Sequence, residues 1–84
     1  MSGLPAIKYR KLARFIKRFG YELIRVCGSH ERYYLKSHSG GDGHITLVKG
    51  ADEIPAGTLR NILNDVSEHT GIPVSRLKEM LCAI

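Results

Sequence analysis

The 84-residue chain contains no tryptophan, only two cysteines, and no apolar run long enough to cross a membrane. A transmembrane helix needs about 18 consecutive apolar residues, so we expect no membrane partner. Cys27 and Cys82 are far apart and lack the spacing of a metal site. The N-terminus also lacks the zones of a signal peptide. We therefore expect a cytoplasmic protein with reduced thiols, no metal site and no cofactor.

Acidic residues are scarce in the first part of the chain. Residues 1–36 hold nine Lys/Arg and two acids, whereas residues 37–84 hold four Lys/Arg and six acids. This asymmetry favours a face directed at phosphates, although an acidic protein partner would fit it as well. The length is sufficient for a single domain, residues 1–84, with a modest core. We expect a shallow site rather than a deep pocket.

Hydrophobic periodicity and turn residues predict six elements. The apolar stripe of residues 6–19 predicts a helix that stops at Gly20. The following elements are strands at 21–26, 30–36 and 44–48, a helix from 58 to Gly71, and a short helix over 73–81. Residues 37–43 form a glycine-rich loop and residues 49–55 a polar connection. The order α-β-β-β-α-α predicts an α+β fold, in which helices cover one face of a three-stranded antiparallel sheet.

The first predicted helix has six cations in eleven positions and no acid. They are Lys8, Arg10, Lys11, Arg14, Lys17 and Arg18. A solvated helix face is the simple interpretation. However, like charges four residues apart weaken a helix by about 0.2–0.5 kcal/mol per pair, so an unbalanced stripe favours an anionic partner. Lys11, Arg14 and Arg18 are our candidate RNA contacts on this helix.

His30 follows the turn residues Gly28 and Ser29 and opens the second predicted strand. An imidazole can accept a proton from a ribose 2′-hydroxyl or return one to the leaving oxygen, and such help typically contributes about 10²–10⁴-fold. Arg25 and Arg32 could stabilise the charge that develops on the phosphate, and Ser29 is a further candidate RNA contact. This scheme needs no metal. The alternative is that His30 is an ordinary polar residue of the strand.

Other ring-bearing residues have less specific interpretations. We expect local structural roles for His38, His44 and His69. Tyr33 and Tyr34 should point to opposite faces of their strand. One would then be a core residue, while the other could stack on a base or simply pack on the surface.

Four segments of the chain are distinctive when taken together. They are Gly20-Tyr21-Glu22-Leu23-Ile24-Arg25, Gly28-Ser29-His30, Ile45-Thr46-Leu47, and the run from Ile54 to Leu63 with its Pro-x-Gly-Thr-Leu-Arg element. In this order they resemble HicA-type toxins. The resemblance extends over nearly the whole chain. Two departures are visible: Lys49-Gly50 stands where the family usually has a proline and a second histidine, and the helix after residue 58 is longer by about one turn.

The resemblance implies a fold like the double-stranded RNA-binding domain and a toxin of a type II toxin–antitoxin pair. It further implies an endoribonuclease that cleaves mRNA, with His30 as the catalytic histidine, and a HicB-like antitoxin as partner. A non-catalytic RNA-binding module, or a HicA-like protein that has lost activity, is the alternative function. A protein-interaction domain whose cationic helix meets an acidic partner is a third.

Overall fold

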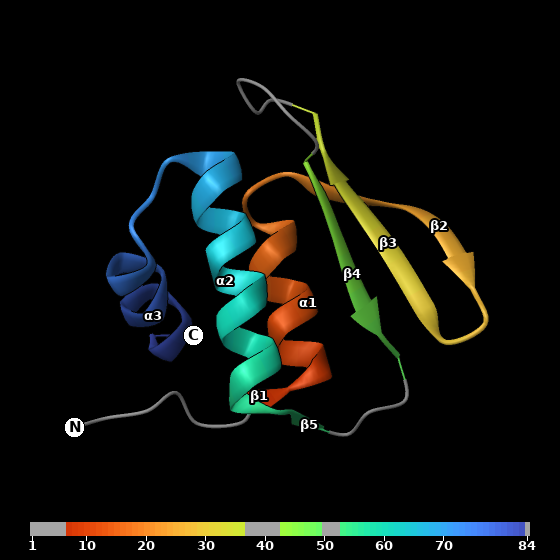
Figure 1. Cartoon of the computed structure of the whole chain (residues 1–84), viewed down its shortest axis with the longest axis horizontal. Helices are drawn as coiled ribbons and strands as arrows, with labels where there is room; N and C mark the ends of the chain where they lie inside the picture. Colours follow the sequence, from red (N-terminus) through yellow and green to blue (C-terminus); the bar gives the residue numbers. More distant parts are fainter. Residues whose placement is uncertain (1–6, 37–42, 50–52, 84) are drawn as a thin grey trace.

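The computed structural model describes residues 7–36, 43–49 and 53–83. Its centre is an antiparallel meander of β2 (Tyr21–Cys27), β3 (His30–Leu35) and β4 (His44–Val48), in the spatial order β2-β3-β4 (Figure 1). All three strands lie where the sequence predicts them. The fold is α+β with this three-stranded sheet and three helices, as expected.

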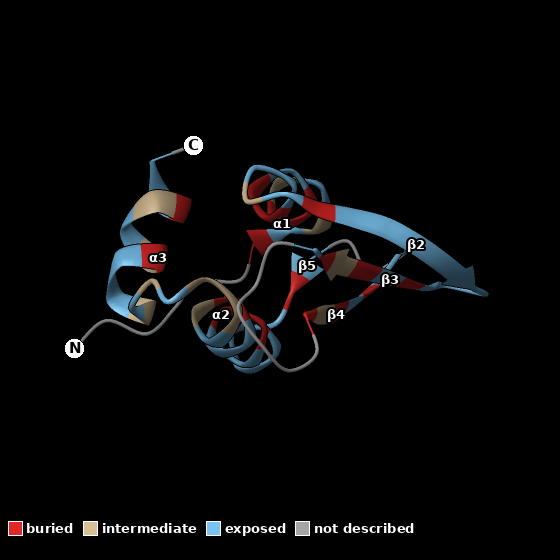
Figure 2. Ribbon diagram, turned by 90° about the horizontal axis from the view of Figure 1, so that it is seen from above, coloured by how far each residue is buried: buried red, intermediate tan, exposed pale blue. Residues whose placement is uncertain are grey.

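Two of the helices, α1 (Tyr9–Lys17) and α2 (Ala56–Thr70), lie against the same face of the sheet, and α3 (Val74–Cys82) packs beside α2 (Figures 1 and 2). We call the face under α1 and α2 the inner face of the sheet and the opposite one the outer face. The inner face and the helices share one hydrophobic core. Its fully buried members include Leu12, Phe15, Ile16, Tyr33, Leu47, Leu59, Leu63 and Leu77.

A second, two-stranded sheet was missed by the sequence interpretation. β1 (Ile7–Lys8) pairs antiparallel with β5 (Glu53–Ile54), so Ile7 faces Ile54 across the pair and both are buried. The chain is therefore extended at residues 7–8, and α1 begins at Tyr9 instead of residue 6. Residue 6, where the sequence predicts the helix to begin, lies outside the described residues. The free energy gained by burying Ile7 and Ile54 is larger than the free energy that two more residues of helix would contribute.

Regular alternation along the first strand would place Tyr21, Leu23 and Arg25 on one face and Glu22, Ile24 and Val26 on the other, and this expectation is wrong after Leu23. The register of β2 against β3 shifts between Leu23 and Arg25, which leaves Ile24 as a bulge. A bulge adds one residue and so exchanges the faces of everything after it. Arg25 consequently shares the outer face with Glu22, whereas Val26 shares the inner face with Leu23.

Candidate functional site

A two-residue turn fixes the position of His30. Gly28 has φ 61° and is the first central residue between β2 and β3, as a type II′ turn requires. This turn makes Cys27 and His30 direct partners across the two strands. The backbone N–H of Lys49 donates to the carbonyl of Ser29 at 2.6 Å, which ties the end of β4 to the turn. The His30 side chain is therefore exposed, while strand pairing and the hydrogen bond from Lys49 to the turn hold the backbone around it in place.

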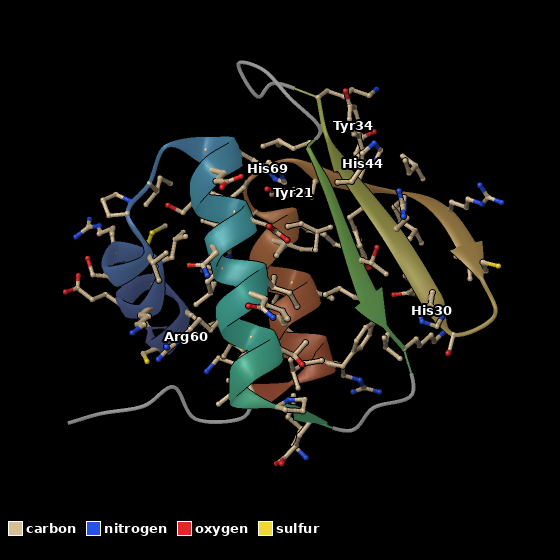
Figure 3. The ribbon with its side chains drawn as sticks, in the orientation of Figure 1. Tyr21, His30, Tyr34, His44, Arg60 and His69 are labelled. Carbon is tan, nitrogen blue, oxygen red and sulfur yellow. The ribbon has the colours of Figure 1, made fainter. Side chains whose placement is uncertain are left out.

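The strand register arranges the outer face in three rows of residues that lie opposite one another. We call them the histidine row (Cys27, His30, Val48), the arginine row (Arg25, Arg32, Thr46) and the aromatic row (Glu22, Tyr34, His44). Successive rows are two residues apart along β3, or about 7 Å. His30 lies at one end of β3 and the Tyr34–His44 pair at the other (Figure 3).

The first two rows enclose an open cleft. Its volume is about 400 Å³, and it is lined by Arg25, Cys27, His30, Arg32 and Thr46. Three of the predicted site residues, His30, Arg25 and Arg32, therefore come together. Ser29 is next to them in the turn. Neither α1 nor α2 covers this side of the sheet (Figure 2).

The charge in this cleft is not balanced within the molecule. Arg25 and Arg32 lie directly opposite each other, and neither forms an ion pair with any other described residue. Like charges in directly opposed positions destabilise a sheet. Two guanidinium groups held together without a carboxylate form a site for an anion such as phosphate.

The cations of α1 lie on the other side of the sheet. Arg14 lines a second groove of about 410 Å³, between α1 and the inner face, together with Arg10 and Lys17. Lys11 and Arg18 line neither groove. The structure therefore separates Lys11, Arg14 and Arg18 from His30, and contact between these three and RNA stays a prediction.

The second groove also contains an acid. Glu31 is 6% exposed, and the Tyr33 hydroxyl donates to its Oε1 at 3.4 Å. Burial, followed by the nearby Glu31 carboxylate, raises the pKa of Tyr33. Because this acid faces the cations of α1, the second groove is partly neutralised. The cleft on the outer face, in contrast, is lined by two arginines and, among the described residues, by no acid.

Two residues of the cleft were missed at the sequence level. Cys27 could have been found, because a two-residue turn at Gly28-Ser29 forces residue 27 to face residue 30. Thr46 could not, because the pairing of β3 with β4 depends on the register across a longer loop. The remaining histidines differ in setting. The Tyr21 hydroxyl and Nδ1 of His69 share a hydrogen bond of 2.7 Å. His44 packs on Tyr34, and His38 lies outside the described residues.

The α+β fold thus presents a cleft with a histidine and two arginines on a sheet face that α1 and α2 leave uncovered (Figure 2). The sequence model of the HicA toxin of bacterial toxin–antitoxin systems matches residues 9–67, and the chain belongs to this family. It is accordingly a toxin component, and the family implies an antitoxin partner. The match includes all three strands of the main sheet and ends before α3.

The other comparisons were negative. Neither the curated proteins nor the solved structures gave a significant match. Among the helices of the described residues, none is both long and apolar enough to span a bilayer.

Proposed function

We propose that the protein is an endoribonuclease that cleaves mRNA in the cytoplasm, with His30 as the proton-transfer group. The observation that carries this proposal is the cleft in which an exposed histidine lies beside two arginines that form no ion pair with another described residue. A fully open sheet face can receive a flexible strand of RNA. The chain belongs to a toxin family, and cleavage of mRNA would account for a toxic effect.

RNA carries its own nucleophile, so the protein needs to supply little covalent chemistry. Nε2 or Nδ1 of neutral His30 would remove the proton from a ribose 2′-hydroxyl while that oxygen attacks the adjacent phosphorus. The bond from phosphorus to the 5′ oxygen breaks, and that oxygen takes up a proton from solvent or from the imidazolium. The products would be a 2′,3′-cyclic phosphate and a 5′-hydroxyl end.

The arginine row supports the same step. During attack the non-bridging oxygens of the phosphate gain negative charge, and guanidinium groups fixed nearby stabilise this charge more in the transition state than in the ground state. Arg25 and Arg32 are the groups that the cleft offers for this role. Ser29 would contact the backbone of the RNA next to His30. No metal takes part in the proposed step.

The direct test is cleavage of a defined RNA by purified protein in the presence of a chelator. We expect His30→Ala to lower the rate about 10²–10⁴-fold, the usual contribution of an acid–base group. A substrate with 2′-deoxyribose at the scissile nucleotide should be inert, and the normal substrate should yield cyclic phosphate ends. Equal cleavage by the native protein and His30→Ala would refute the role of His30.

A non-catalytic RNA-binding protein is the second candidate. The observation in its favour is that no described residue forms a hydrogen bond with the His30 imidazole, so no group in the described part of the chain orients the ring. In sequence, Gly50 also stands where the family usually has a second histidine. Binding of RNA without any turnover, in both the native protein and His30→Ala, would establish this alternative.

We further propose that the antitoxin partner is HicB-like and covers the cleft. Four large apolar side chains of the strands that carry the cleft are 42–55% exposed, namely Leu23, Ile24, Val26 and Val48. Val48 belongs to the histidine row and Ile24 to the bulge before Arg25, whereas Leu23 and Val26 share the inner face. Exposed apolar groups beside a charged cleft are suited to a protein interface. The complex should therefore neither bind nor cleave RNA, and an equimolar complex that retained full cleavage would contradict this placement.

A further inference from the structure

The aromatic row lies outside the cleft, on the same face of the sheet. Tyr34 and His44 face each other across β3 and β4, with ring centroids 4.9 Å apart and ring planes at 43°. Tyr34 shares the outer face with Arg32 and His30, because residues 30, 32 and 34 alternate with the inward-facing Glu31, Tyr33 and Leu35. The pair therefore lies on the line that runs from the histidine row through the arginine row (Figure 3).

Hydrogen bonding through Nδ1 of His44 does not explain why Tyr34 and His44 pack together. Nδ1 of His44 is shielded from solvent and has no hydrogen-bond partner. Buried polar atoms usually find a partner, and leaving one unpaired lowers stability. Nδ1 of His44 therefore forms no hydrogen bond that holds the sheet together, and what the structure shows of this ring is its aromatic contact with Tyr34.

The charge also changes along the outer face. The arginine row presents two cations without an ion pair among the described residues, whereas the aromatic row contains Glu22, whose carboxylate pairs with Lys36 at 3.5 Å. A phosphate would be attracted to the first row and not to the second. An uncharged aromatic ligand, in contrast, matches the second row.

These observations together define an order of groups. Along about 13 Å of β3 the outer face presents a histidine, then cations, then aromatic rings. Single-stranded nucleic acid alternates anionic phosphates with flat bases, and proteins bind it by combining cations for the phosphates with aromatic rings for the bases. We propose that Tyr34, packed against His44, forms a base-binding subsite for the nucleotide next to the phosphate held by Arg25 and Arg32.

This inference rests on the proposed function for its choice of RNA as ligand, but not on catalysis. The subsite would place one unpaired base at a fixed distance from His30 and thereby select the bond that is cleaved. Because every base has a stacking face, the subsite would require an unpaired base rather than a particular one. Paired RNA would be a poor substrate for the same reason.

The test uses a single-stranded RNA oligonucleotide with 2′-methoxy riboses, which cannot be cleaved, and a set of copies with one abasic nucleotide at each position in turn. We expect one abasic position to weaken binding by about 5- to 100-fold, the usual contribution of a stacked base. Tyr34→Leu should remove this difference between intact and abasic RNA. Tyr34→Phe should preserve it, because the ring remains.

Each protein serves as its own reference, since the measured quantity is the ratio of two affinities for one variant. Loss of fold in Tyr34→Leu is checked by its thermal unfolding, and His44→Leu offers a second route to the same result. A uniform effect of all abasic positions, an unchanged ratio in Tyr34→Leu, or a failure of the native protein to bind the oligonucleotide would overturn the inference. A single sensitive position in a protein that cleaves nothing would support the subsite while refuting the endoribonuclease.

Discussion

The two faces of the three-stranded sheet are formed by alternate residues of the same strands, yet they differ in almost every property. On the inner face Tyr33, Ile45 and Leu47 are at most 2% exposed and belong to the core. On the outer face His30, Arg32 and Thr46 are exposed, and no other residue in the described part of the chain forms an ion pair with either arginine of the cleft. The alternation of a strand thus separates residues that stabilise the protein from residues that are available to a ligand.

The largest effect should come from the inner face. Leu47→Ala removes a side chain that is 1% exposed, and we expect it to reduce the free energy of unfolding by about 2–5 kcal/mol. Its neighbour Val48 is 42% exposed on the outer face, so Val48→Ala should reduce it by less than about 1 kcal/mol. Urea unfolding of both variants measures the difference. Equal losses would show that the outer face is also part of the core.

The second effect concerns binding. Replacing Arg25 and Arg32 by glutamine should weaken binding to single-stranded RNA and reduce the log–log salt slope by about 1.4, since each phosphate contact contributes about 0.7. It should also stabilise the fold by a few tenths of a kcal/mol, because like charges no longer oppose each other.

The matched control replaces Arg14 of α1 and Arg18, which directly follows that helix, and so changes the net charge equally away from the cleft. Fluorescence titrations at several salt concentrations compare the two double variants. If the α1 variant lost as much of the salt slope, the helix cations predicted from the sequence would be RNA contacts, and the outer face would not be the sole binding surface.

The turn that positions His30 should show a smaller effect on stability. An added Cβ at Gly28 meets no atom within 4 Å, so the penalty of Gly28→Ala comes from its φ of 61° and should be about 1–2 kcal/mol. Gly57, near the start of α2, also has open space but no positive φ, and Gly57→Ala should stabilise by about 0.5–1 kcal/mol. Thermal unfolding should give shifts of opposite sign, and shifts of the same sign would contradict the assigned turn.

The smallest expected effect on stability concerns Tyr21 at the start of β2, which forms a hydrogen bond with His69 near the end of α2. Burial and the nearby Asp65 carboxylate raise the pKa of Tyr21 above its usual value of 10. Above pH 10 the unfolded chain releases this proton and the folded chain keeps it, so stability falls as pH rises, by up to about 1.4 kcal/mol per pH unit.

Tyr21→Phe removes this titration together with the hydrogen bond to His69. We expect the variant to be about 1 kcal/mol less stable at neutral pH and to approach the native protein in alkali. Urea unfolding at pH 7 to 11 tests this expectation, and parallel curves for the two proteins would contradict it.

Much of this architecture could be predicted, because the signals are local. The apolar spacing of Leu59, Ile62, Leu63 and Val66 predicts α2, and all four are buried. Gly71 ends that helix with φ 79° as expected. The resemblance of Gly28-Ser29-His30 and the later segments to HicA-type toxins supplied the family, which residue spacing alone did not.

The parts that could not be predicted depend on contacts between distant segments. The pairing of Ile7 with Ile54 is too short to leave a periodic pattern. The bulge at Ile24 has no turn residue to mark it, although it places Arg25 in the cleft. The sequence also shows that α1 is cationic, but not that the sheet lies between its charges and His30.

The central claim is that RNA binds the outer face of the sheet. Backbone amide signals recorded by NMR during titration with the uncleavable 2′-methoxy oligonucleotide test it most directly. We predict that the largest shifts fall on the outer-face rows around His30, Arg32 and Thr46, while α1 and α2 change little. Shifts concentrated on Arg10, Arg14 and Lys17 of α1 would contradict the claim and place the RNA on the opposite side of the sheet.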